Sequence, residues 1–146
     1  MELLQDAEFD LESYISAEIA RAFGVAEEQA FCVGTGANQP TGIFTANGGA
    51  VGVTAAAAST VTADELISLI YALKSPYRRN AKFLMNDATV SAIRKLKDGN
   101  GVYLWQPALQ AGQPDKLLGF DLVTSPYVPT METGALPIAF GDFNNY

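Results

Sequence analysis

The sequence predicts an α+β fold in which a long helix accompanies a mixed sheet flanked by two shorter helices. Apolar residues recur every three or four positions across residues 10–33, which is the period of one helix face. Capping signals near residues 62 and 86 mark the starts of two further helices. Short apolar stretches lie between and after these helices and are typical of strands. Strands interleaved with capped helices favour a sheet covered by helices.

Residues 10–33 are predicted to form an acidic amphipathic helix. Its apolar face would consist of Leu11, Ile15, Ile19, Ala22, Ala26 and Ala30. Asp10 is a favourable N-cap and Gly34 a natural end, whereas Gly24 should cost about 1 kcal/mol relative to alanine and marks a candidate bend. At about 1.5 Å per residue the helix would extend about 36 Å. Such a helix is either one wall of a domain or a rod that lies against another chain.

The second helix begins after residue 61. Thr62 and Glu65 form a capping box, and Pro76 is expected to set the end of the helix. Its predicted buried face consists of Leu66, Ile67, Leu69, Ile70 and Leu73. The spacing of these residues requires a sheet or another helix to cover one side of this element.

The predicted strands and the third helix complete this second part of the chain. The strands are residues 81–85, 101–107, 117–129 and 136–143. Asn86 caps the third helix, which would end at Gly99 or Gly101. Residues 108–115 contain a glycine and a proline and are expected to form a surface loop.

The composition limits the possible chemistry. A chain of 146 residues with 49% apolar and 17% charged residues has the make-up of one folded domain. It contains no histidine, which removes the commonest general base and the commonest metal ligand. Cys32 is the single cysteine, so neither an intrachain disulfide nor a cysteine-based zinc site can form. We expect Cys32 to be a small buried hydrophobe, with a reactive thiol as the alternative.

Neither a signal peptide nor a membrane span is predicted. The first ten residues are acidic and lack the basic region and apolar core of a signal peptide. Apolar runs stay well short of the roughly 20 residues that cross a bilayer. We therefore expect an intracellular, reducing origin and no membrane partner.

The charges are separated along the chain. The net charge is −7, and eight of the sixteen acidic residues fall within the first 28 positions, where Arg21 is the only base. Seven of the nine basic residues lie further along, at Lys74, Arg78, Arg79, Lys82, Arg94, Lys95 and Lys97. These are either two solvated faces or complementary surfaces that orient neighbouring copies. A nucleic-acid site is the weaker interpretation because the overall balance is acidic.

The motifs give no support to catalysis. Residues 34–44, GTGANQPTGIF, resemble a dinucleotide fingerprint, but Gln39 replaces its third glycine and the segment follows a helix rather than a strand. The carboxylates after the first helix form no pair that would serve general acid–base chemistry or bind a divalent metal. No catalytic, cofactor-binding or metal residue is therefore predicted.

The order of the motifs resembles that of a known family. The relevant stretches are DLESYISAEIARAFGVAEEQAF followed by GTGANQPTGI, then FLMNDATVSAIRKLKDGNGVYLW, LLGFDLVTSPYVP and PIAFGDFNNY. In this order they resemble the major capsid proteins of tailed double-stranded-DNA bacteriophages. These proteins have the Hong Kong 97 capsid fold, which encapsulin nanocompartments share.

The resemblance implies a fold, a function and partners. Residues 10–33 would be the spine helix, residues 1–45 would belong to the peripheral domain, and residues 46–146 would form part of the axial domain. The protein would be a structural head protein, not an enzyme, that assembles in the bacterial host cytoplasm into hexamers and pentamers of an icosahedral virion shell. The shell would enclose double-stranded DNA held non-specifically, without cofactors, and scaffold or portal proteins would be further partners. An encapsulin-like shell is the alternative, and a small hydrolase or nucleotide-binding enzyme is the third.

The resemblance also implies subunit contacts. The candidate interface residues are Glu12, Glu18, Glu27, Glu28, Gly34, Gly36, Asn38, Arg78, Arg79, Lys82, Trp105, Gln110 and Gln113. Residues 106–117 would lie near the symmetry axes, and Trp105 is expected to be a core or interface anchor rather than a ligand platform. The N-terminal arm, the extended hairpin and the C-terminal strands of the family have no counterpart here, so we expect a fragment, with a degenerate prophage product as the alternative. Much of the sheet that covers the apolar face of the first helix would then lie outside these residues.

Overall fold

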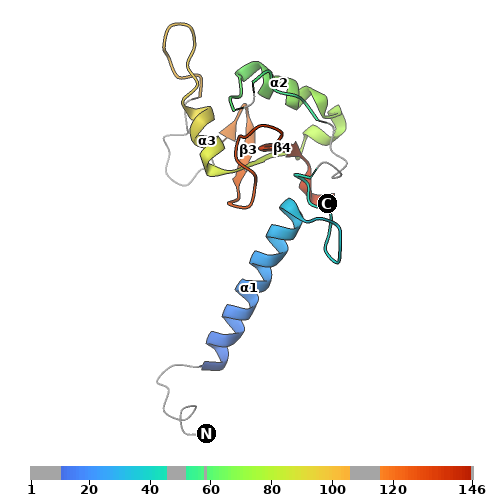
Figure 1. The fold of residues 1–146 in the computed structure, drawn as a ribbon. Helices are drawn as coiled ribbons and strands as arrows, with labels where there is room; N and C mark the ends of the chain where they lie inside the picture. Colours follow the sequence, from blue (N-terminus) through green and yellow to red (C-terminus); the bar gives the residue numbers. More distant parts are fainter. Residues whose placement is uncertain (1–10, 46–51, 58, 106–115, 146) are drawn as a thin grey trace.

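The computed structural model describes residues 11–45, 52–57, 59–105 and 116–145, and Figure 1 shows their arrangement. In chain order the elements are α1 (Leu11–Val33), α2 (Ala63–Ala72), the 3-10 helix η2 (Ser75–Arg78), β1 (Lys82–Met85), α3 (Asp87–Arg94), β2 (Lys116–Leu117), β3 (Phe120–Thr124), β4 (Ile138–Gly141) and the 3-10 helix η3 (Phe143–Asn145). A long helix therefore accompanies a helix-covered mixed sheet, which confirms the predicted α+β class.

The first helix is a rod. It runs without interruption over Leu11–Val33, as predicted, while its expected cap, Asp10, lies outside the described residues. In Figure 1, α1 projects away from the rest of the fold, and only its C-terminal end reaches the sheet and its helices, which we call the lobe. Ile15, Ile19 and Phe23 are 47%, 51% and 66% exposed. The apolar face is therefore uncovered by the described part of the chain.

The sheet is mixed and has β1 near its centre. The strand order is β2-β3-β1-β4, with β1 parallel to β3 and antiparallel to β4. Phe83 and Met85 alternate with Leu84 along β1, and both are fully buried on one face. A strand that is paired on both sides and apolar on both faces is the natural centre of the lobe.

The main core lies between this face of β1 and the two short helices. Leu66 and Ile70 of α2 and Val90 and Ile93 of α3 pack there with Phe83 and Met85. The rings of Phe83, Phe120 and Phe140 extend the core across three strands, with centroid separations of 4.6 to 6.3 Å. Leu84 points to the opposite face and belongs to a second, smaller core.

Helix α2 has the predicted capping box but differs at two other points. Thr62 N donates to Glu65 Oε2 at 2.7 Å, and Glu65 N donates to Thr62 Oγ1 at 3.3 Å. Ile67 is 42% exposed, so its predicted burial is wrong; the buried stripe runs through neighbouring positions instead. The helix ends at Ala72, and Pro76 lies in the first turn of η2 rather than ending α2.

Helix α3 ends earlier than predicted. Asn86 caps it as expected, since its side chain accepts a 3.0 Å hydrogen bond from Ala88 N, but the helix stops at Arg94 and not at a glycine. The chain then turns into a hairpin in which Asp98 Oδ1 accepts 2.8 Å bonds from the amides of Asn100 and Val102. These bonds draw the backbone away from the helical path.

Two predicted strands are also corrected. Residues 101–105 contain only an isolated bridge from Tyr103 to Lys97, so the predicted strand over 101–107 is absent from its described part. The predicted strand over 117–129 is divided into β2 and β3 by a tight turn at Leu118 and Gly119, whose φ angles are 51° and 87°. Two consecutive positive φ angles are the geometry of a two-residue hairpin turn.

Candidate assembly surfaces

A small apolar core joins α1 to the lobe. Cys32, Phe44 and Val128 are 4%, 7% and 2% exposed, and Leu84 and Ala139 of the sheet pack against them. Burial of Cys32 confirms its expected role as a small hydrophobe. Desolvation raises the pKa of its thiol, an effect that the neighbouring Glu28 carboxylate reinforces and that a hydrogen bond to Ser125 opposes. This joint determines where the rod leaves the lobe.

The glycine-rich segment after α1 closes this joint. It folds back along the end of the helix, with Phe44 N donating to Cys32 O at 3.0 Å and Gly42 N donating to Gly34 O at 2.8 Å. A Cβ atom on Gly42 would lie 2.5 Å from the carbonyl oxygen of Cys32, so only glycine allows this approach. Gly34 and Gly42, which belong to the segment that resembled a nucleotide-binding loop, therefore allow two stretches of backbone to pack closely together.

The tip of the same segment is exposed. Gly36 and Asn38 have φ angles of 81° and 57°, and a bridge between Thr35 and Thr41 closes the loop beneath them. Gln39 Nε2 donates to Thr35 Oγ1 at 3.0 Å, which orders the tip further. Two of the predicted interface residues, Gly36 and Asn38, thus lie on an ordered, solvent-facing loop, whereas Gly34 is buried beneath it.

One face of α1 carries a mixed acidic and apolar stripe. Its members are Glu12, Ile15, Ile19, Phe23 and Glu27, which are all exposed and are separated by three or four positions. On a helix of 3.6 residues per turn this stripe lies about opposite to Cys32, which faces the lobe. The stripe is consequently the side of the rod that faces away from its own lobe.

The other two predicted acidic residues of α1 have partners within the chain. Glu18 pairs with Arg21 at 2.8 Å. Glu28 accepts a 2.6 Å hydrogen bond from the hydroxyl of Ser125, at the end of β3. Glu12 and Glu27 are therefore the α1 carboxylates best placed to meet a separate molecule.

A basic groove lies at the end of the sheet where β1 begins. It encloses about 440 Å³, and its polar lining is Arg79, Asn80, Lys82, Lys116, Asp121 and Asn144. The strand register brings Lys82 opposite Asp121 on β3 and Gly141 on β4. Lys116 Nζ lies 3.9 Å from Asp121 Oδ1, and within the described residues neither Arg79 nor Lys82 forms an ion pair. The groove thus retains two cations without a carboxylate partner in this part of the chain.

Two other predicted interface residues hold the lobe together. Arg78 Nε donates to Leu73 O at 2.7 Å and its guanidinium lies 4.8 Å from the Tyr71 ring centroid. Trp105 packs against the main core, and its Nε1 donates to Lys116 O at 2.9 Å. Trp105 is therefore a core anchor. Gln110 and Gln113 lie outside the described residues, as does most of the predicted axial loop.

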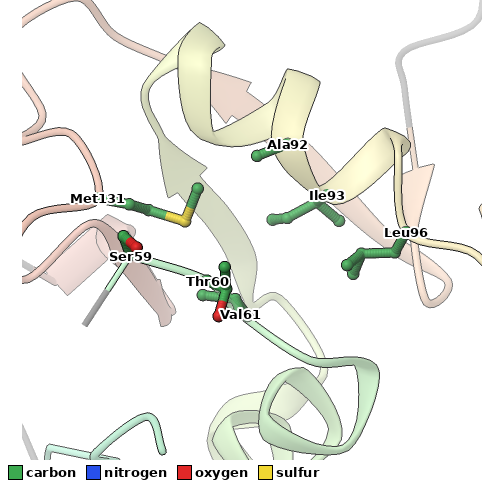
Figure 2. A pocket seen from close by; sticks show the side chains of 7 residues that line it. All are labelled: Ser59, Thr60, Val61, Ala92, Ile93, Leu96 and Met131. Carbon is green, nitrogen blue, oxygen red and sulfur yellow. The ribbon is translucent and has the colours of Figure 1, made fainter. Parts of the chain in front are cut away.

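A second pocket is small and apolar. It measures about 70 Å³ and lies between α3 and the segment before α2. In Figure 2, Ile93 and Leu96 lie on α3 and the residues just after it, while Val61 and Met131 come from two other segments. Pockets that hold small-molecule ligands usually span about 300–1,000 Å³, so this one suits a single side chain at most. In the described ranges, no set of three or more acidic or cysteine side chains is close enough to hold a metal, and no helix could cross a membrane.

The groove contains residues that the sequence did not single out. Lys116 on β2 and Asn144 in η3, which follows β4, join Arg79 and Lys82 only because these distant segments meet near the start of β1. No local pattern indicates this meeting of distant segments. By contrast, Phe23 follows Ile19 at the helical spacing and could have been recognised as part of the α1 stripe.

Comparisons with known proteins agree on one family. The chain matches the phage capsid family over residues 1–146, and no curated protein matches it. A chain from the capsid of an empty GTA particle, computed with C5 symmetry, is 39% identical, with a TM-score of 0.83 over 99% of this chain and 54% of that chain. The corresponding chain of the native GTA particle is 38% identical, with the same TM-score, over 99% and 53%. The chain thus spans about half the length of these capsid chains and has their Hong Kong 97-type fold. It belongs to the phage capsid family.

Proposed function

We propose that the chain is part of a major capsid protein that self-assembles into hexamers and pentamers of an icosahedral shell around double-stranded DNA. The observation that carries the proposal is the match to a chain of an assembled GTA capsid at 39% identity and a TM-score of 0.83. That capsid was computed with C5 symmetry, which agrees with the fivefold capsomers that we propose. The role is structural rather than catalytic, and residues 1–45 and 46–146 serve as the peripheral and axial parts.

The surfaces of the chain support assembly. Large apolar side chains on α1 are about half exposed in the described part of the chain, so either the rest of the same protein or a neighbouring subunit must cover them. Arg79 and Lys82 of the groove, which form no ion pair within the described residues, and the exposed carboxylates of α1 add complementary charge. Many modest contacts of this kind, repeated around a ring, suit a shell built from identical subunits.

The interior partner is packaged DNA, bound without sequence preference. A net charge of −7 disfavours strong contacts with DNA phosphates. It therefore suits a shell that encloses DNA but binds it only weakly. Assembly takes place in the cytoplasm of the bacterial host, with scaffold and portal proteins as further partners. The finished protein is then a component of the virion.

We favour this function over an encapsulin-like compartment because the matched family and both solved structures are capsids. The genes beside this one would discriminate between the two. Terminase and portal genes accompany a capsid protein, whereas a peroxidase or ferritin-like cargo gene accompanies an encapsulin.

Light scattering of the full-length protein across a salt series tests the proposal. We expect particles whose amount depends on ionic strength, because contacts between opposite charges are screened by salt. A parallel series with sucrose at equal osmolality controls for effects unrelated to charge. A monodisperse monomer at every salt concentration would contradict the proposed function.

A further inference from the structure

The basic groove at the start of β1 contains two cations, Arg79 and Lys82, that no carboxylate of the described residues pairs with. Arg79 and Lys82 are both exposed and form no ion pair within the described residues, whereas Lys116 Nζ lies 3.9 Å from Oδ1 of Asp121, the residue opposite Lys82 in the strand register. At about 440 Å³ the groove is large enough to receive a side chain together with a short stretch of backbone. Asn80 and Asn144 add hydrogen-bonding groups beside the cations. This lining suits a carboxylate.

We propose that the groove binds the outer end of α1 from a second copy of this chain, with Glu12 of that copy meeting Arg79 and Lys82. The proposal rests on the shell function argued above and names one of its contacts. Glu12 is exposed and has no partner in the described part of its own chain.

The geometry requires the two groups to come from different copies. Glu12 lies 20 residues before Cys32, which is about 30 Å along the helix from the joint with the lobe. Figure 1 shows α1 leading away from the lobe throughout this length. The stripe also faces away from Cys32, so a rigid rod cannot return Glu12 to the groove of its own lobe.

The charge distribution favours a protein carboxylate over a nucleic-acid phosphate. Described α1 residues carry four glutamates against Arg21, whereas the groove has three cations against Asp121. Asp121 lies inside the groove and would repel the continuous charge of a nucleic-acid backbone. A rod end on one copy and a groove on the next form a heterologous contact, which is the type of contact that builds rings.

A charge-exchange cycle on the full-length protein tests the contact. The cycle consists of Arg79→Glu, Glu12→Lys and the two combined. A fourth variant, Lys82→Gln, removes the charge of the second cation without placing a new negative charge beside Asp121. Lys74→Glu is the matched control, because it reverses an exposed charge outside the groove. Sedimentation velocity at low salt measures self-association, and thermal melting verifies that each variant is folded.

We expect each single reversal to weaken self-association about tenfold or more, and the combined variant to recover most of the loss. Lys82→Gln should weaken association less, and Lys74→Glu should leave it unchanged. The proposal would be overturned if the two losses of self-association simply added in the combined variant. It would also be overturned if the wild-type chain did not self-associate at low salt. Loss of DNA retention in Arg79→Glu with unchanged association would overturn it in favour of a phosphate site.

The cycle separates this contact from the shell function. If the variants formed shells as well as the wild type does, the groove contact would be contradicted, whereas the capsid function would still be supported. A wild-type protein that forms pairs obeying the cycle but never shells would support the contact and contradict the capsid function.

Discussion

The hydroxyl of Ser125 donates a 2.6 Å hydrogen bond to Glu28 Oε1 and thereby links α1 to the end of β3 across 97 positions of sequence. The same hydroxyl accepts a 3.3 Å bond from Tyr127 N and lies 3.9 Å from Cys32 Sγ. Asn86, which caps α3, donates to the carbonyl oxygen of Val128 at 3.1 Å and holds the adjoining turn. A few polar contacts around a small apolar core therefore set the direction in which α1 leaves the lobe.

Replacing Ser125 by alanine should destabilise this joint. The change removes a hydrogen bond to a carboxylate and leaves the amide of Tyr127 without its acceptor, at an expected cost of about 1–2 kcal/mol in the free energy of unfolding. Denaturant titration measures the cost. Glu27→Ala, one position before Glu28 and exposed, is the control and should change stability by no more than about 0.5 kcal/mol. Equal effects of the two changes would contradict the role given to Ser125.

The thiol of Cys32 should be unreactive in the folded chain. Burial raises its pKa, so less of the reactive thiolate forms in the fold than in the unfolded chain, where the pKa is about 8.5. For the same reason, the stability contributed by the neutral thiol is present below pH of about 8.5 and is lost as the pH rises through the higher folded value. Iodoacetamide labelling with and without denaturant checks the first statement. Similar labelling rates in both conditions would show that the joint is open.

Two glycine-to-alanine changes should have opposite effects. Gly24 lies inside α1 with no atom within 4 Å of an added Cβ, so Gly24→Ala should stabilise the helix by up to about 1 kcal/mol. At Gly42 the added Cβ would lie 2.6 Å from Gly34 N, so the backbone must shift and stability should fall by about 1–3 kcal/mol. Thermal unfolding of both variants tests the pair. A gain in stability at both sites would rule out the tight backbone approach at the joint.

The capping box of α2 should make stability depend on pH in the acid range. A hydrogen bond from Ala56 N, and then one from Thr62 N, lowers the pKa of Glu65. A carboxylate whose folded pKa is depressed stabilises the fold above its ordinary value of about 4.3, and this contribution is lost as the pH falls through the lower folded value.

Unfolding experiments on Glu65→Gln against the wild type should show this dependence. The difference in stability between the two should be present at neutral pH and shrink below about pH 4.3. Asp64→Asn removes a neighbouring charge at the same helix end and is the control, because Asp64 makes none of these hydrogen bonds. A difference that stays constant across the acid range would exclude the proposed bonds to the ionised carboxylate.

Local signals in the sequence predicted the elements they govern. The period of apolar residues indicated the extent of α1, and the capping residues Thr62 and Asn86 indicated the starts of α2 and α3. The predicted ends of these two short helices were wrong because the segment after each helix decides where it stops. After α2 the chain enters the turn of η2 that begins around Pro76, and after α3 it enters the hairpin organised by Asp98.

Contacts between distant segments could not be predicted in this way. The turn between β2 and β3 places Leu118 at a positive φ, where asparagine or glycine is usual. Of the two turn residues only Gly119 is of the expected type, so the sequence does not clearly predict the turn. The parallel pairing of β1 with β3 brings Lys82 opposite Asp121 and creates the groove, yet nothing near either residue indicates the pairing. The hydrogen bond from Ser125 to Glu28 depends on the same long-range arrangement.

Electron microscopy of particles purified from cells that express the full-length protein tests the central claim most directly. The capsid function predicts closed shells of regular diameter, built from fivefold and sixfold capsomers. Only monomers or irregular aggregates, found at every salt concentration and in the presence of the neighbouring phage genes, would contradict it.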